Sequence, residues 1–153
     1  MRAIQLLGIG SSMEVKFGTG LDNIRFGLDQ ASLKSLLGEP SKIDSDNDGL
    51  PLLQYNKLKS TFWMDERDKL HWIQCSNPEL SIQGINIIGL DTDEAISKLK
   101  QIIEASYEFE DYGSMESYSF PELELEIQTE YGVVTTVCFG HLWKNGEPVY
   151  TNA

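Results

Sequence analysis

Residues 122–127 read Glu122-Leu-Glu-Leu-Glu-Ile127, a strict alternation of acidic and apolar side chains. Successive side chains of a β-strand point to opposite faces, so this period of two predicts a half-buried strand whose leucine and isoleucine side chains face a core. Apolar segments elsewhere in the chain read as strands of the same sheet, and short turns at 65–68 and 130–132 join them into antiparallel meanders. These segments are Ser60–Met64, Leu70–Cys75 and Val133–Phe139.

A helical pattern precedes each meander. The first predicted helix begins after Asp29, a good N-cap residue, and ends before Gly38 and Pro40; its apolar positions are Leu33, Leu36 and Leu37. The second follows Asp91, which with Glu94 matches a D-x-x-E capping box; its apolar stripe is Ile96, Leu99, Ile102 and Ile103.

The chain also shows a weak internal repeat. Gly27-Leu-Asp29 matches Gly89-Leu-Asp91 at an offset of 62, and Cys75 matches Cys138 at an offset of 63. We therefore expect a single domain, 1–153, with pseudo-repeats at about 24–78 and 86–140. The expected fold class is α+β, with two tandem helix-plus-antiparallel-meander repeats forming one sheet that carries its helices on one face.

The overall charge narrows the classes of partner. Twelve Lys and Arg against 24 Asp and Glu give a net charge of −12, which repels nucleic-acid phosphate and anionic lipid. No apolar run approaches the roughly 20 residues that a membrane span needs. Two cysteines do not make a disulfide framework and suit a reducing compartment. We expect a cytoplasmic protein that binds neither nucleic acid nor membrane.

The negative charge is concentrated in one stretch. No Lys or Arg occurs from Gln101 to Trp143, while nine acidic residues do. One interpretation is a solvated face that only keeps the protein soluble; the other is a docking surface for a basic protein, anchored by aromatic side chains. The predicted partner-binding residues are Glu108, Glu110, Asp111, Tyr112, Glu116, Glu122, Glu124, Glu126 and Trp63. Trp63 aligns with Glu126 between the repeats, which would place it on the outward sheet face, although a tryptophan in a strand more often lies in the core; both positions stay open.

Other motifs carry less chemistry. The segment Asp44–Gly49 matches the first half of an EF-hand loop, but Tyr55 stands where the twelfth-position Glu should be, so it reads as an Asp-rich turn, with weak calcium binding as the alternative. His71 and His141 belong to no metal-ligand motif. Cys75 and Cys138 read as small buried apolar residues. The sequence predicts no catalytic residue, metal or cofactor.

Gly27-Leu-Asp29 followed by Leu36-Leu-Gly38-Glu-Pro40 resembles the helix entry and exit of small outer-membrane assembly lipoproteins. The doubled plan resembles β-lactamase inhibitor protein, which grips its target with one sheet face. In size and acidity the chain is similar to the immunity proteins that neutralise bacterial toxins. These resemblances imply a non-enzymatic, immunity-type inhibitor that binds and neutralises a basic protein toxin, such as a nuclease. The alternative is a small enzyme or ligand-binding domain with a pocket between helices and sheet.

Overall fold

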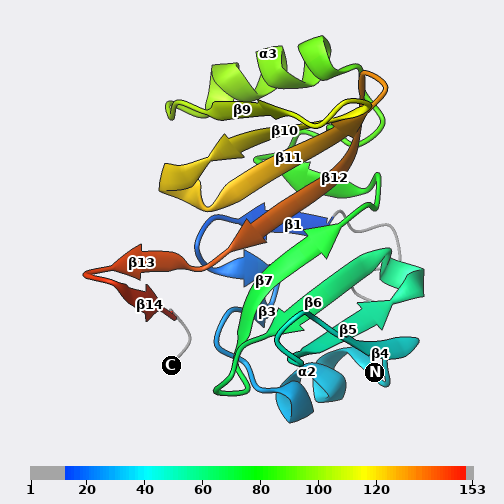
Figure 1. Ribbon diagram of the computed structural model, residues 1–153, viewed down its shortest axis with the longest axis vertical. Coiled ribbons are helices and arrows are strands. Elements are labelled where there is room, and N and C mark those ends of the chain that lie inside the picture. The colour runs from blue at the N-terminus through cyan, green and yellow to red at the C-terminus, as the bar shows by residue number, and fades with distance from the viewer. Residues whose placement is uncertain (1–12, 151–153) are drawn as a thin grey trace.

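The computed structural model describes residues 13–150, and the chain over this range is mostly β. Its main feature is an antiparallel sheet of eight strands in the spatial order β4-β5-β6-β7-β12-β11-β10-β9 (Figure 1). One half consists of β4 (Lys42–Ser45), β5 (Pro51–Tyr55), β6 (Ser60–Met64) and β7 (Leu70–Cys75). The other half consists of β9 (Glu108–Asp111), β10 (Met115–Phe120), β11 (Leu125–Glu130) and β12 (Val133–Gly140).

A smaller four-stranded sheet has the order β3-β2-β1-β8, in which β1 and β8 run parallel. Its strands are β1 (Met13–Lys16), β2 (Gly20–Leu21), β3 (Ile24–Arg25) and β8 (Leu80–Ile82). The chain ends in a separate hairpin of β13 (Leu142–Lys144) and β14 (Glu147–Val149), which projects from the end of β12 (Figure 1).

Two α-helices and two short 3-10 helices complete the described part of the chain. They are α2 (Gln30–Leu37), α3 (Thr92–Ile102), η1 (Asn56–Leu58) and η2 (Pro121–Leu123). Within residues 13–150, no helix combines the length and the apolar character that crossing a membrane requires.

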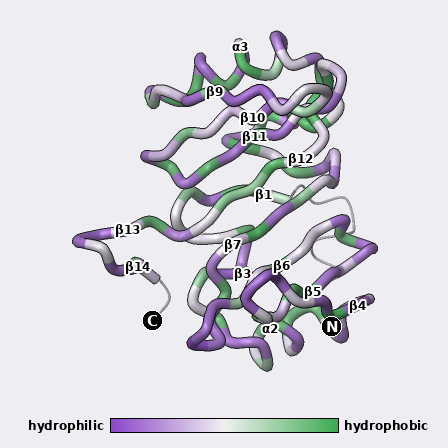
Figure 2. Tube along the Cα trace, viewed as in Figure 1, coloured by the Kyte–Doolittle hydropathy of each residue, from purple (hydrophilic) through white to green (hydrophobic). Residues whose placement is uncertain are grey.

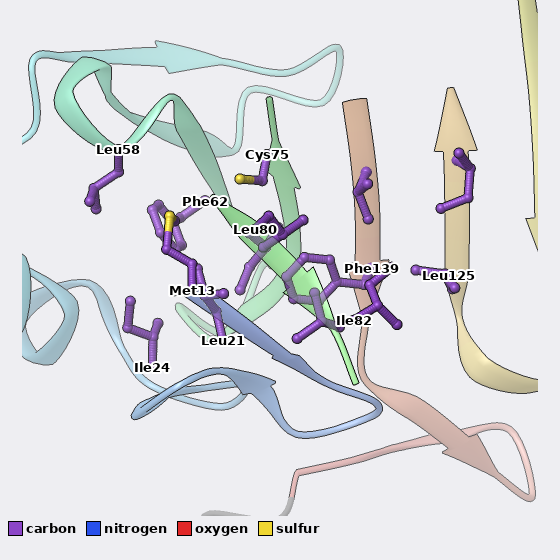
Figure 3. Close-up of a cluster of buried hydrophobic side chains, with 14 of the residues drawn as sticks. Met13, Leu21, Ile24, Leu58, Phe62, Cys75, Leu80, Ile82, Leu125 and Phe139 are labelled. Carbon is purple, nitrogen blue, oxygen red and sulfur yellow. The ribbon is translucent and has the colours of Figure 1, made fainter. Parts of the chain in front are cut away.

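The core lies between the two sheets. Leu53, Phe62, Ile73, Phe139 and Leu125 are cross-strand partners in register on one face of the large sheet, and all are buried. In Figure 3, Phe62 and Phe139 lie among Met13, Leu80 and Ile82 from the smaller sheet. Burying this shared apolar surface is what holds the two sheets together.

The opposite face of the large sheet is polar, and we call it the outer face. Glu126, Cys138, Gln74, Thr61 and Gln54 are successive cross-strand partners along it. Cys138 is buried but is not part of the core cluster, as expected for a small side chain on the outer face between larger neighbours. Figure 2 shows the resulting mixture of hydrophobic and hydrophilic residues along the strands.

The predicted fold class is wrong in its architecture. The chain is mostly β rather than a pair of helix-plus-meander units with helices covering one face. Eight strands span about 34 Å at ~4.8 Å spacing, and two helices about 10 Å wide leave the middle of that face uncovered. The smaller sheet fills the middle, and the helices lie at opposite ends (Figure 1). The pseudo-repeat boundaries of 24–78 and 86–140 stay a prediction.

Several predicted elements are confirmed. The strands at Ser60–Met64 and Leu70–Cys75 have the expected bounds, and the first helix ends at Gly38 with φ 83°. Other expectations need correction. Glu122–Glu124 lies in η2 and a left-handed position before β11, and the acidic loop at Glu108 is the edge strand β9. Asp91 precedes α3 without a side-chain capping bond.

Candidate functional site

A pocket of about 520 Å³ is formed where β6, β7 and the β13–β14 hairpin meet. Three chain segments far apart in sequence form its walls: the turn between β4 and β5, the turn between β6 and β7, and the hairpin with its following residue. Its lining includes Asp46, Asp48, Trp63, Asp65, Glu66, Arg67, His71, His141, Trp143, Glu147 and Tyr150.

Aspartate side chains fix the two turns in the wall. Asp46 Oδ1 accepts hydrogen bonds from the backbone N–H groups of Asp48 at 2.8 Å and Leu50 at 2.9 Å. Asp65 Oδ1 accepts from the N–H groups of Arg67 at 2.8 Å and Lys69 at 2.9 Å. Asp44 and Ser45 belong to β4, and the rest of the segment Asp44–Gly49 forms the predicted Asp-rich turn. The turn is stabilised because the short side chain of Asp46 accepts hydrogen bonds from the backbone of the turn itself.

Tyr150 ties the chain after the hairpin to the sheet. Its hydroxyl donates a 2.8 Å hydrogen bond to Asp65 Oδ2. Burial acts to raise the pKa of Asp65, but this bond and the backbone bonds from Lys69 and Arg67 outweigh it, so the net pKa is lowered. Burial, together with Asp65, raises the pKa of the Tyr150 hydroxyl. The ionised Asp65 thus connects two segments of the pocket wall, the turn between β6 and β7 and the residue that follows the β13–β14 hairpin.

His141 is the centre of the aromatic part of the pocket. The side chain is buried, and its ring centroid lies 4.7 Å from Trp143, 5.1 Å from Tyr150 and 6.3 Å from His71. Its Nδ1 lies 2.9 Å from the carbonyl oxygen of Leu142. A carbonyl can only accept, so Nδ1 is the donor and carries the proton. The two histidines pack against each other and line the same pocket, and His141 also packs against Trp143 and Tyr150.

The electrostatic character of the pocket is strongly negative. Its described lining contains five carboxylate side chains, Asp46, Asp48, Asp65, Glu66 and Glu147, against the single guanidinium of Arg67. Burial lowers the pKa of His71, although Asp65 acts in the opposite direction, so this imidazole stays neutral at neutral pH. The arrangement favours a positively charged ligand.

Trp63 lies on the outer face, half-buried, and lines the pocket. It is the cross-strand partner of Trp72, which in turn pairs with Gly140. The indole Nε1 of Trp63 is buried and has no hydrogen-bond partner among the described residues. Of the two positions the sequence left open, the structure has the outward one, while the partner-binding role of Trp63 stays a prediction.

Part of the predicted acidic surface is assembled at the β9 edge of the outer face. We call Glu108, Glu110 and Glu126 the edge cluster; Ser117 and Ser119 on β10 are the cross-strand partners that link them. Ser117 Oγ donates a 2.6 Å hydrogen bond to Glu126 Oε2. The exposed Tyr112 donates a 2.7 Å bond to Glu110. These three carboxylates and Tyr112 share one side of the sheet.

The remaining predicted residues lie elsewhere. Glu116 pairs with Asp111 and with the buried Thr129, so both acids face the α3 side of the sheet. Glu122 is exposed in η2. Burial raises the pKa of Glu124, while nearby His141 acts to lower it. The backbone carbonyl of Glu124 accepts a 3.0 Å hydrogen bond from the N–H of Gly140, the residue before His141. The nine predicted partner-binding residues therefore do not form a single surface patch in the structure.

The acidic stretch is not neutralised within the described chain. Ion pairs between residues 13–150 join Lys34 to Glu39, Lys42 to Asp44 and Lys98 to Glu94, all outside the stretch. Four of its carboxylates, those of Glu110, Asp111, Glu116 and Glu126, accept hydrogen bonds from other described residues instead.

Sequence reasoning missed the pocket as a site. The Asp-rich turn, the two histidines and Trp63 are each recognisable in the sequence as separate candidates. Their grouping is not, because about 100 residues separate Asp46 from Glu147. Trp143 and Glu147 belong to the sequence Trp143-Lys-Asn-Gly-Glu147, which is typical of a hairpin turn. Such a sequence predicts the turn but not which part of the sheet the turn contacts.

Comparisons with known proteins find structures of similar fold but no family to which the chain can be assigned. No family model and no curated protein matches the chain. A solved structure of an extracellular protein containing an SCP domain, from Bacillus anthracis, aligns with a TM-score of 0.50 and 16% identity, covering 75% of this chain and 43% of that one. A cysteine-rich secretory protein from Staphylococcus aureus aligns with a TM-score of 0.47 and 12% identity, covering 75% and 42%.

These comparisons correct two expectations. The resemblance to immunity proteins and β-lactamase inhibitor protein is wrong, because the aligned structures are of a different kind, and the classification as a toxin inhibitor falls with it. The predicted cytoplasmic location is contradicted as well, because the protein that aligns with a TM-score of 0.50 is described as extracellular. At such identities the likeness concerns the fold alone, and the chain spans less than half the length of either solved structure.

Proposed function

We propose that this chain is a non-enzymatic binding protein that holds a positively charged segment of a partner protein. The pocket is the anchor, and the edge cluster attracts the same segment from a distance. The single observation that carries the proposal is the lining of the pocket, about 520 Å³ in volume. It contains five carboxylates, the side chains of two tryptophans, one tyrosine and two histidines, and one guanidinium among the described residues.

Two physical effects support a cationic ligand. A charge of +1 that enters the pocket meets net negative charge in a partly desolvated site, where the effective dielectric constant is lower than in water. The aromatic residues Trp63, Trp143 and Tyr150 line the pocket, and an ammonium or guanidinium placed over the face of one of these rings would gain about 0.5–2 kcal/mol of cation–π attraction. A side chain of Lys or Arg supplies both the charge and an apolar stem that packs on the rings.

The edge cluster contributes at longer range. Five strand spacings separate β9 from β6, a distance of about 24 Å at ~4.8 Å per strand. This exceeds the Debye length of roughly 8–10 Å at physiological salt, so the cluster acts on a long extended segment or at low ionic strength rather than on one side chain in the pocket. Its role is to speed association.

The experiment that tests the proposal is calorimetric titration with a hexamer of lysine, using a hexamer of glutamate as the negative probe. The variant D48N/E66Q/E147Q removes three carboxylates of the pocket that form no described ion pair. We expect its affinity for hexalysine to fall by about tenfold or more. The matched control, E79Q/D93N/E104Q, makes the same change of net charge outside the pocket and should change the affinity by less than about twofold.

Equal losses in the two triple variants would contradict the proposal, because binding would then follow net charge and not the pocket. Absence of hexalysine binding to the native protein at low salt would contradict it outright.

A second candidate function, the binding of a small cationic molecule, is favoured by the size of the pocket. About 520 Å³ lies within the range of about 300–1,000 Å³ that is typical of small-molecule sites, and His71 lines it. The pocket lies on the outer face, not between helices and sheet. A small amine such as n-butylammonium that competed with hexalysine at equal concentration would favour this candidate.

A further inference from the structure

Strand β9 has a partner strand on one side of its backbone only. It is the last strand of the large sheet, and among residues 13–150 only β10 pairs with it (Figure 1). The N–H of Tyr112 donates a 2.8 Å hydrogen bond to the carbonyl oxygen of Met115 across the turn that joins the two strands. Hydrogen-bonded and non-hydrogen-bonded pairs alternate in an antiparallel ladder, so Phe109 and Asp111 belong to non-hydrogen-bonded pairs. Their N–H and C=O groups therefore point away from β10.

The two faces of β9 differ in chemistry. Glu108 and Glu110 lie on the outer face with the rest of the edge cluster. Phe109 lies on the opposite face, where it pairs with Tyr118, which in turn pairs with the buried Ile127. The rings of Phe109 and Tyr118 lie 5.1 Å apart, and Tyr118 packs against the core, yet 49% of Phe109 is exposed. A half-exposed aromatic ring thus extends the apolar surface to the edge of the sheet.

The charge of this edge decides which strand fits it. A second copy of this chain, with its net charge of −12, would bring further carboxylates against those of β9, and charged side chains on an edge strand prevent such self-pairing. A basic strand meets the opposite condition. Its Lys or Arg side chains on the outer face would lie beside Glu108 and Glu110, and cross-strand pairs of opposite charge are stabilising. No ion pair within residues 13–150 involves either carboxylate.

We propose that the free edge of β9 binds an extended segment of a partner protein as an additional antiparallel strand. The segment presents basic side chains on the outer face and an apolar side chain opposite Phe109, and its backbone bonds to the N–H and C=O groups of Phe109 and Asp111. The antiparallel direction continues the large sheet, in which all strand pairs are antiparallel.

This interaction surface goes beyond the proposed function, because its hydrogen bonds and its apolar contact are made at β9 and not in the pocket. Hexalysine has no apolar side chain for the position opposite Phe109. It therefore remains a probe of the pocket, and a different probe is needed for the edge.

The test uses the peptide acetyl-Lys-Val-Lys-Val-Lys-Val-Lys-amide and two methylated forms of it. In the proposed pairing the residues opposite Phe109 and Asp111 are valines, and their N–H groups face β9. Methylation of the three valine nitrogens removes these donors and should weaken binding by about tenfold or more. Methylation of the first three lysine nitrogens, which face away from β9, should weaken it by less than about twofold. Nuclear magnetic resonance titration at the amide signals of Phe109 and Asp111 measures binding at this edge.

Hydrogen exchange of single backbone amides tests the pairing directly. The N–H groups of Phe109 and Asp111 have no partner strand in the free protein, so bound peptide should slow their exchange by about tenfold or more. The N–H groups of Glu108 and Glu110 already face β10 and should change less.

A pair of variants tests the apolar contact. Phe109→Thr keeps a residue that favours strands and removes the ring, so it should lower the affinity for the unmethylated peptide by about fivefold. Ile43→Thr is the matched control, because Ile43 is an apolar residue with 47% exposure on β4, the other edge strand of the same sheet. It should leave the affinity unchanged.

This inference and the proposed function fail on different results. Equal affinities for the two methylated peptides, or unchanged exchange at Phe109 and Asp111 with saturating peptide, would overturn the inference. If calorimetry then shows peptide binding that D48N/E66Q/E147Q abolishes, the peptide binds in the pocket and the proposed function stands. Slowed exchange of the two amides in a protein that fails to bind hexalysine would overturn the proposed function and support the strand at β9.

Discussion

At the scale of single residues, Gly140 shows how one position shapes the outer face. It is the last residue of β12 and the cross-strand partner of Trp72. A Cβ added here would lie 2.5 Å from Cε3 of the Trp72 ring and 2.9 Å from the carbonyl oxygen of His71. Glycine is required because the indole ring lies against the backbone where any side chain would begin.

We expect Gly140→Ala to lower the free energy of unfolding by about 1–3 kcal/mol, the usual cost of overpacking a filled site. Chemical denaturation monitored by circular dichroism measures it. In a Trp72→Leu background the same substitution should cost less, because the ring that clashes is gone. An equal cost in both backgrounds would show that the clash with the ring is not the cause.

His71 makes stability depend on pH in a defined direction. Burial lowers its pKa below 6.5, with Asp65 opposing and His141 adding to the effect. In the unfolded chain the imidazole takes up a proton near pH 6.5, so as the pH falls below that value the unfolded state binds more protons and the native state loses stability. Above about pH 6.5 the imidazole of His71 is mostly neutral in both the folded and the unfolded state, so its protonation no longer lowers the free energy of unfolding.

We therefore expect the free energy of unfolding of the native protein to fall more steeply than that of His71→Gln between about pH 7 and 5.5. Above about pH 7.5 the two curves should run parallel. Urea denaturation at a series of pH values measures both slopes. Parallel curves through the whole range would mean that His71 has the same proton affinity in the folded and unfolded states.

At the scale of elements, α2 illustrates how well local rules work. Asp29 Oδ1 accepts a 2.7 Å hydrogen bond from the backbone N–H of Ser32, and bonding from Ser32 lowers the pKa of Asp29. Leu33 and Leu37 face the core, and Gly38 ends the helix. Each of these features is a short-range consequence of residue type, and each was visible in the sequence.

Asp29→Ala should lower the free energy of unfolding by about 1 kcal/mol, because the N–H of Ser32 loses its acceptor. Asp29→Asn keeps a capping oxygen and should cost only a few tenths of a kcal/mol. Denaturation of the three proteins in urea at neutral pH checks the order. Equal losses for alanine and asparagine would assign the effect to the charge of Asp29 and not to its cap.

Strand β9 shows where local rules fail. All four of its residues, Glu108–Asp111, are exposed, because it is the edge strand and neither of its faces is fully covered. A strand without a buried side has no alternation of apolar and polar residues, so its sequence looks like an acidic loop. Only its pairing with β10 makes it a strand. The same holds for β4 at the other edge, where every residue is exposed.

At the scale of the whole molecule, the distribution of charge is the dominant property. The net charge is −12, and the stretch from Gln101 to Trp143 has no basic residue. The fold distributes that stretch over both sides of the sheet, because the edge cluster lies on the outer face while Asp111 and Glu116 lie on the opposite one. A partner on the outer face therefore meets part of the charge that the sequence suggested.

Glu108→Lys/Glu110→Lys should slow the association of hexalysine severalfold at low salt and leave its dissociation rate nearly unchanged, because these residues attract the ligand without contacting it in the pocket. Stopped-flow tryptophan fluorescence measures both rates. The effect should vanish at high salt, where surface charges are screened. Glu39→Lys/Glu79→Lys makes the same charge change away from the cluster and should slow association less. A slower rate that persisted at high salt would contradict steering.

By itself the sequence determined the local features of this protein: the capped helix after Asp29, the strands at Ser60–Met64 and Leu70–Cys75, the turn at Asp46 and the net charge of −12. Each depends on contacts between residues a few positions apart. Tertiary structure alone decided that a second sheet covers the core, and that Asp48, Trp63, His141 and Glu147 surround one cavity. Contacts across such distances in sequence arise only when whole sheets pack, because burial of a shared apolar face, and not local propensity, selects the partner of each strand.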